Sequence, residues 1–234
     1  TNTNGLDGPN GIGTGLRDAV NALNPGDEIV ILGNYLVKDH TVLIDKNLTI
    51  QGQDNSLITY NGTNCSVPML SITGGGILKD LTIAGADCSG VSRDLVSVNS
   101  QVDLNIEHTT LTNGGRAVDI KSGDGMVTLA FNHITGNQDY ALYQGKGLGS
   151  GTVKLYANNI HSNRVGAQVN CNNLGTADHN FWGEGVLASS GAEFCTISDA
   201  KTLGAPILTN ANVPGVQALM QTVTDTFSTA FDNN

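Results

Sequence analysis

The stretch Lys46-Asn47-Leu48-Thr49-Ile50-Gln51-Gly52 returns in related form as Lys79-Asp80-Leu81-Thr82-Ile83-Ala84-Gly85. Shorter versions of this pattern follow at 108–113, 131–136, 157–162 and 179–183. The central apolar residues are Ile50, Ile83, Leu111, Ile134, Ile160 and Trp182. They recur at steps of roughly 33, 28, 23, 26 and 22 residues, which suits one turn of a solenoid, and the longer steps indicate inserted loops.

Positions on either side of this column keep the same register. Five residues before it lie Leu78, Ile106, Leu129 and Leu155. Seven and nine residues after it lie Val118 and Ile120, Ala141 and Tyr143, and Ala167 and Val169. Apolar residues at every second position are typical of strands, and stacked turns bury what one turn cannot. The sequence therefore predicts an all-β fold, a right-handed parallel β-helix over residues 14–200.

Three asparagines, Asn132, Asn158 and Asn180, also share one column, at a predicted bend between strands. Side chains stacked there can hydrogen-bond along the solenoid to amides of the turns that no strand partner reaches. We therefore expect an asparagine ladder.

Both ends of such a stack need covers. A capping helix is predicted at 14–24, with Thr14 as its cap and an apolar face of Leu16, Ala19, Val20 and Leu23. Residues 1–13 form an N-terminal arm, and 201–234 form an extended arm and an amphipathic helix. The apolar stripe of this second helix comprises Val216, Leu219, Met220, Val223, Phe227 and Phe231. This helix either covers the last turn, which we favour, or docks on another molecule.

Two motifs carry a resemblance to known proteins. The order of an amphipathic helix, Pro25-Gly26-Asp27, Ile29–Leu32, Gly33-Asn34-Tyr35 and Lys46–Gly52 resembles the opening of the pectate-lyase-like superfamily of right-handed β-helices. Asn180-Phe181-Trp182-Gly183 is similar to the end of the repeats in many secreted or surface β-helix proteins of bacteria and archaea. The resemblance implies the fold and leaves the function open, because this scaffold carries lyases, hydrolases, adhesins and inert spacers.

Composition narrows the class of partner and the compartment. The 234 residues carry a formal net charge of −10, which argues against nucleic acid or an anionic membrane as partner. No apolar run reaches the roughly 18 residues that span a bilayer. The chain begins without Met, as a secreted protein does after removal of its signal peptide. We therefore expect an extracellular or cell-surface location.

Four cysteines, without CxxC spacing, favour two disulfides in an oxidising compartment over a metal site. Three connectivities are open, and the register favours Cys65–Cys88 and Cys171–Cys195. Three sequons, at Asn47, Asn61 and Asn64, are no more than chance provides, although the loop around Asn61 and Asn64 is a plausible acceptor.

Catalytic patterns are weak. The candidate acids for hydrolysis are Asp119, Asp124 and Asp139. The register places Asp119 over Leu142 and Gln168 and not over another acid, so we interpret all three as solvated. Arg116, Asp119 and Lys121 form the best cluster for a lyase, with Asp119 and Lys121 pointing outward. The competing interpretation, which we favour, is a surface ion pair between Arg116 and Asp139 on adjacent turns. The five histidines lack metal-ligand spacing, and no cofactor is expected.

The favoured function is therefore that of an extracellular structural protein, a self-associating subunit of a fibre, sheath or surface layer. The expected partners are copies of itself, joined head to tail through Thr1–Gly13 or Thr202–Asn234, with a cell-surface or extracellular polysaccharide as a further candidate. The alternatives are a glycan-binding or adhesive module and a polysaccharide lyase or hydrolase. An enzyme is the less favoured reading, because no recognisable catalytic constellation is present.

The expected disulfides can be checked by mass spectrometry of an unreduced digest. Cys65 should be linked to Cys88 and Cys171 to Cys195, because the predicted register brings each pair within bridging distance. A Cys65–Cys171 link would contradict the register itself.

Overall fold

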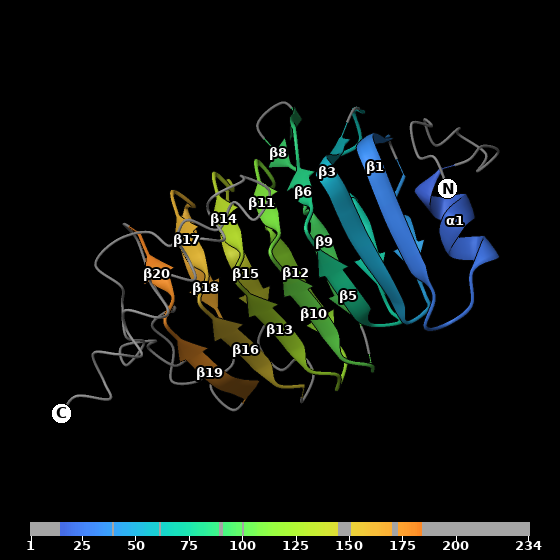
Figure 1. The fold of residues 1–234 in the computed structure, drawn as a ribbon. Coiled ribbons are helices and arrows are strands. Elements are labelled where there is room, and N and C mark those ends of the chain that lie inside the picture. The colour runs from blue at the N-terminus through green and yellow to red at the C-terminus, as the bar shows by residue number, and fades with distance from the viewer. Residues whose placement is uncertain are drawn as a thin grey trace.

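The repeated segments stack as the turns of a parallel β-solenoid. The computed structural model describes residues 15–38, 40–60, 62–88, 91–99, 101–144, 151–169 and 173–183. These residues form about five turns, preceded by one short helix (Figure 1). The predicted all-β fold with a parallel β-helix is confirmed. The predicted C-terminal helix and both terminal arms lie outside the described residues.

The strands follow one another around three faces of the solenoid. The first face consists of β5 (Gly76–Lys79), β10 (Leu104–Glu107), β13 (Val127–Ala130), β16 (Val153–Tyr156) and β19 (Leu174–Asp178). The second face consists of β6 (Thr82–Ala84), β11 (Thr110–Thr112), β14 (His133–Thr135), β17 (Asn159–His161) and β20 (Phe181–Trp182). The third face is a separate six-stranded sheet of β2 (Val42–Ile44), β4 (Leu70–Ile72), β9 (Val96–Asn99), β12 (Val118–Ser122), β15 (Tyr140–Gln144) and β18 (Val165–Gln168).

The first two faces belong to one 12-stranded sheet because they share its longest strand, β3 (Leu48–Tyr60). The start of β3 pairs with β5 and its end with β6. β1 (Glu28–Val37) pairs with β3 on the N-terminal side and is bulged between Leu32 and Asn34. Outside the three faces, β7 (Asp87–Cys88) and β8 (Val91–Ser92) pair antiparallel.

The sharing of β3 corrects the start of the predicted column. Its later members, from Ile83 to Trp182, are successive partners on the second face, as predicted. The first member was wrong, because Ile58 precedes Ile83, whereas Ile50 pairs with Leu78 on the first face. The motif that begins at Lys46 therefore lies on the first face, and the motif that begins at Lys79 leads into the second face. The reason is that β3 runs unbroken through the corner between these faces, where the later turns have a break between two strands.

The third face shows a second difference of register. Val118 pairs with Leu142 and not with the predicted Ala141. The chain from Ile134 to Leu142 is one residue longer than the equivalent chain in the turns on either side, which shifts β15 by one position. Because neighbouring residues of a strand point to opposite sides, this shift exchanges inward and outward positions.

The N-terminal cover is α1 (Leu16–Ala22), shorter than the predicted helix at 14–24. Leu16 and Val20 are fully buried against the first turn, as predicted. Thr14 lies outside the described residues, and Gly15 stands at the start of α1 without a side-chain cap. The C-terminal end of α1 is held by Lys46, whose Nζ donates to the carbonyls of Val20, Asn21 and Leu23 at 2.8, 2.9 and 2.7 Å. A cation there also complements the helix dipole.

The predicted asparagine ladder is confirmed at the corner between the first and second faces. Asn158 is fully buried, and its Nδ2 donates to the Leu129 carbonyl and to Asn180 Oδ1, both at 2.8 Å. Its Oδ1 accepts hydrogen bonds from the backbone N–H and the Nδ2 of Asn132, at 2.9 and 3.0 Å. One residue before the ladder position, five turns carry a left-handed residue with φ between 51° and 58°: Asp80, His108, Phe131, Ala157 and His179. At this sharp corner the backbone groups cannot all pair with a neighbouring strand, and the buried asparagine amides supply the missing hydrogen bonds.

A second ladder, which sequence reasoning missed, lies at the corner that leads to the third face. Asn137 Nδ2 donates to Asn163 Oδ1 at 2.8 Å, and Asn137 Oδ1 accepts from the Gly114 N–H at 2.9 Å. The two corners of each middle turn are thus tied by the same chemistry.

The predictions for the cysteines and the sequons fall only partly on residues that the structure describes. Cys65 is not a free thiol; the side chain of Cys88 and the whole of Cys171 and Cys195 lie outside the described part, and both pairings stay predictions. Asn47 and Asn64 are exposed, and Asn61 lies outside the described residues. No described helix is long and apolar enough to cross a membrane.

The ladder can be tested by Asn158→Ala, which should lower the free energy of unfolding by about 3 kcal/mol because several buried partners lose their hydrogen bonds together. Urea denaturation monitored by circular dichroism measures this loss. Asn105→Ala, at an outward position of β10, is the matched control and should cost less than about 0.5 kcal/mol. Equal losses in the two variants would show that the ladder is not a special contributor.

Candidate functional site

A groove of about 600 Å³ lies over the third face. One wall is the segment Cys65–Pro68, and the rest comes from residues before and within β9, β12, β15 and β18. Its lining residues are Cys65, Ser66, Val67, Pro68, Asp94, Ser97, Gly115, Arg116, Lys121, Gln138, Asp139 and Arg164. The groove therefore collects charged side chains from successive turns.

The wall is fixed by a fully buried arginine. Arg93 donates to the carbonyls of Lys38 and His40 at 2.6 Å, to that of Pro68 at 2.7 Å, and to that of Val67. Its guanidinium also lies 4.6 Å from the centre of the Tyr60 ring. Because burial of a cation is costly without partners, these bonds hold the wall segment to the solenoid. They also fix the backbone that leads into Asp94.

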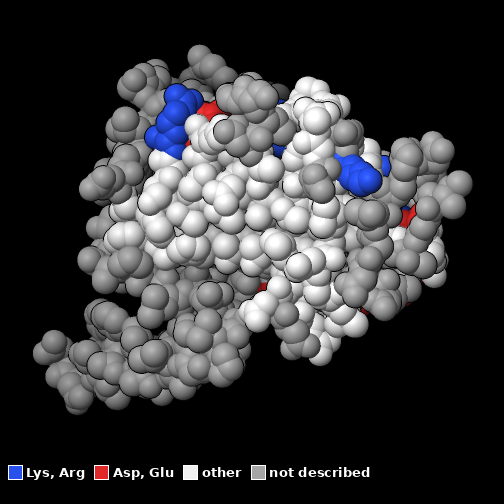
Figure 2. All heavy atoms as spheres, turned by 90° about the horizontal axis from the view of Figure 1, so that it is seen from above, with Lys and Arg blue, Asp and Glu red and all other residues white. Residues whose placement is uncertain are grey.

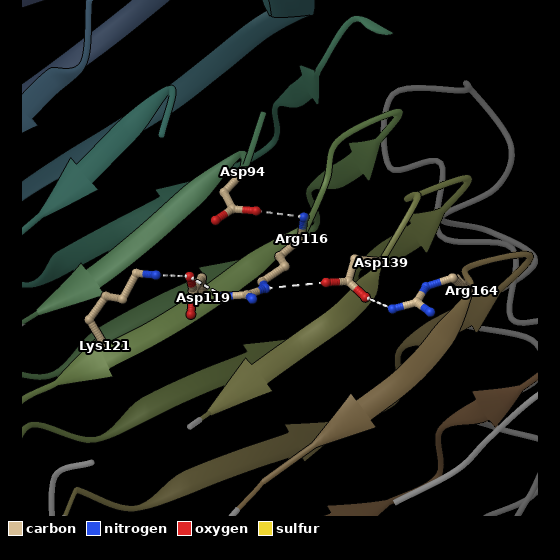
Figure 3. Close-up of polar contacts among 6 residues, drawn as sticks. All are labelled: Asp94, Arg116, Asp119, Lys121, Asp139 and Arg164. Carbon is tan, nitrogen blue, oxygen red and sulfur yellow. Dashed lines mark hydrogen bonds and ion pairs between the residues drawn. The ribbon is translucent and has the colours of Figure 1, made fainter. Parts of the chain in front are cut away.

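A chain of ion pairs crosses the groove from Lys121 through Asp119, Arg116 and Asp139 to Arg164 (Figure 3). Arg116 Nη1 lies 2.8 Å from Asp119 Oδ2, and Arg116 Nε lies 3.5 Å from Asp139 Oδ2. The predicted contact between Arg116 and Asp139 is thus confirmed. The Arg116 guanidinium also covers the ring of Tyr143, at 4.1 Å from its centre.

The acidic side chains of the cluster are more deeply buried than most of its basic ones. The Asp119 side chain is 0% exposed, whereas its partners Arg116 and Lys121 are 27% and 50% exposed. Asp139 is 28% exposed beneath Arg164, which is 66% exposed. The prediction that Asp119 is a solvated outward residue was therefore wrong. Asp119 does leave the core side of β12, between Ser97 and Tyr143, but its long cationic neighbours cover it.

Asp94 extends the cluster by one turn and forms a carboxyl pair with Asp119. Its Oδ1 accepts a hydrogen bond from the Arg116 backbone N–H at 2.8 Å. Burial raises the pKa of Asp94, and the charge of Asp119 and a hydrogen bond to it act in the same direction, against the lowering effects of the Arg116 N–H and guanidinium. Asp119 Oδ1 is buried without a hydrogen-bond partner. A proton on Asp94 would turn this carboxyl into a donor toward Asp119.

Sequence reasoning missed Asp94 and Arg164, although a signal was present. Asp94, Arg116, Asp139 and Arg164 follow one another by 22, 23 and 25 residues, so charges of alternating sign recur at the solenoid period. Of the predicted acids, Asp119 and Asp139 meet at Arg116, whereas Asp124 does not line the groove.

The chemistry open to this cluster is limited by its geometry. Glycosidases present two carboxyl groups to the substrate, about 5 to 10 Å apart, whereas Asp119 is 0% exposed beneath Arg116 and Lys121. Within the described ranges, no group of three His, Cys, Asp or Glu side chains could hold a metal ion. The arrangement is suited to binding a charged group at its exposed cations.

Comparison of the chain with known protein families, curated proteins and solved structures finds no match.

The carboxyl pair predicts an effect of pH on stability. Because folding raises the pKa of Asp94, the folded state holds this proton more tightly than the unfolded chain. The pair therefore favours folding below the ordinary pKa of aspartic acid and loses that contribution as the pH rises through the raised value. Asp94→Asn keeps an oxygen for the Arg116 N–H and supplies an uncharged donor to Asp119. This variant should be more stable than the wild type at pH 7 and no more stable at pH 3.

Urea denaturation across this pH range measures both proteins. Asp103→Asn, which changes a carboxylate that accepts from the Met126 N–H on an exposed loop, is the control and should not gain stability at pH 7. A destabilised Asp94→Asn protein at pH 7 would show that Asp94 is needed as a carboxylate.

Proposed function

We propose that this protein is an extracellular β-helix of the pectate-lyase-like superfamily that binds an acidic saccharide chain in the groove of its third face. The observation that carries the proposal is the sorting of charge by depth: Asp119 is buried, while Lys121 and Arg164 are at least half exposed. A ligand that enters the groove meets cations first, on a chain whose net charge is −10.

The spacing of the cations suits a repeating ligand. Lys121 belongs to β12, and Arg164 immediately precedes β18, two turns further along. Adjacent strands are about 4.8 Å apart, so the two cations are offset by about 10 Å along the solenoid axis. Carboxylates on different sugar units of one chain can reach both, with Arg116 between them. Asp119 and the partly exposed Asp139 hold the cations in place and leave part of each cation exposed for the ligand.

The binding should depend on ionic strength. Each cation is already paired with a carboxylate, so the attraction is that of partly neutralised charges and is weakened by salt. Extracellular location, which the proposal includes, is supported by the four cysteines without CxxC spacing.

The test is calorimetric titration of the full chain with polygalacturonate, alginate and hyaluronate at low and physiological salt. We expect binding of at least one of them, weakened at least tenfold by Lys121→Gln or Arg164→Gln, and further weakened by salt. Lys154→Gln, on the first face, removes a cation outside the groove and should bind like the wild type. Absence of binding to all three polymers, or equal loss in Lys154→Gln, would overturn the proposal.

A second candidate function is that of a self-associating structural subunit of a fibre, sheath or surface layer. It is favoured by a broad face with almost no charged side chain among the described residues (Figure 2). Head-to-tail stacking through Val216, Leu219, Val223, Phe227 and Phe231 stays a prediction, because these residues lie outside the described part.

A further inference from the structure

Unlike the groove, the second face carries no charged side chain at the outward positions that the structure describes. Its outward positions on β6, β11, β14 and β17 alternate with the buried column. They are occupied by Thr82, Ala84, Thr110, Thr112, His133, Thr135, Asn159 and His161. Figure 2, which views the molecule from the side of β11, β14 and β17 in Figure 1, shows this uncharged surface.

A row of rings borders this face at the asparagine-ladder corner. His108, Phe131, Tyr156 and His179 contact one another in order, with ring centres 5.2, 5.5 and 5.4 Å apart. Their planes meet at 61° to 83°, so each ring turns its edge to the next. Sugars stack on flat ring faces, and this row offers no continuous flat platform. A saccharide is therefore not the occupant that the row favours.

The N-terminal end of the solenoid is closed to a stacked neighbour. Leu16 and Val20 of α1 are fully buried on the first turn, and three hydrogen bonds from Lys46 hold the end of the helix. A second molecule that stacked on this end would have to remove the helix first. Contact between copies through this end is therefore disfavoured, and the sides of the solenoid are the other described surfaces that a copy can reach.

We infer that the second face pairs with the second face of another copy of this chain, in a two-fold symmetric contact. This inference rests on the second candidate function. Two copies with a charge of −10 each repel wherever their acidic surfaces meet, and a surface without charge avoids that cost. A two-fold contact needs only one self-complementary surface, which each copy necessarily supplies. Threonine hydroxyls and histidine ring nitrogens can form hydrogen bonds across it.

His133 makes this contact sensitive to acid. The rings of His133 and His161 lie 5.0 Å apart within the face. The groups that neighbour them are uncharged: Thr110 and Asn159 on either side of His133, and Thr135, Ser162 and Phe181 around His161. Burial, followed by the charge of His161, lowers the pKa of His133. The His133 ring is therefore neutral at pH 7.5, and its protonation in acid places like charges on both sides of the contact.

Sedimentation velocity of the full chain over a range of concentrations tests this inference. At pH 7.5 the wild type should self-associate, and Thr112→Lys should weaken the association at least tenfold because it places a cation in the contact. Thr128→Lys adds the same charge to an outward position of β13 on the first face and should associate like the wild type. Circular dichroism should confirm that both variants are folded.

Lowering the pH well below the ordinary pKa of histidine should dissociate the wild type, because the pKa of His133 is itself lowered, and the variant His133→Gln should remain associated. If Thr112→Lys associates like the wild type, the second face is not the contact. Self-association would then occur through another surface. A wild type that stays monomeric at millimolar concentration would overturn both the inference and the structural function. Neither outcome bears on saccharide binding in the groove.

Discussion

The stacking of turns depends on hydrogen bonds at the corners as much as on those between strands. Strand ladders satisfy the backbone only along the faces, and each turn must bend sharply to pass from the first face to the second. At that bend a residue adopts left-handed φ, and the next position in the last three turns is a buried asparagine. Asn158 bonds to groups in the turns before and after it. Loss of one amide therefore disturbs three turns, and the apolar column inside can stay in register only while the corners hold.

The same stacking organises charge in the groove. A parallel solenoid places equivalent residues of successive turns at one short spacing, so acids and bases that recur at the period become neighbours. Asp119 lies deepest, and the longer side chains of Arg116 and Lys121 fold over it. Depth of burial, rather than the number of charges, decides which sign the surface presents. An acidic chain thereby displays cations at one place.

Periodicity in the sequence was sufficient for the fold and for most of the interior. It placed Ile83, Leu111 and Ile134 in one column and anticipated the contact between Arg116 and Asp139. It was wrong where the chain departs from the average turn: at Ile50, where β3 passes a corner unbroken, and at Ala141, where one extra residue shifts the strand. Periodicity could not predict the burial of Asp119, because that burial depends on whether neighbouring side chains are long enough to cover the carboxylate. Asp94 and Arg164 could have been predicted from the sequence if charged residues, like apolar ones, had been compared at the period of the solenoid.

The alternation of Asp94, Arg116, Asp139 and Arg164 also bears on how such a chain can lengthen in evolution. Repeat proteins grow by duplication of coding segments. A duplicated single turn would set two acids or two bases on adjacent rungs of this row, whereas a duplicated pair of turns would continue the alternation unbroken. Duplication of two turns at a time would therefore preserve the charged row, whereas the apolar interior would accept duplication of a single turn.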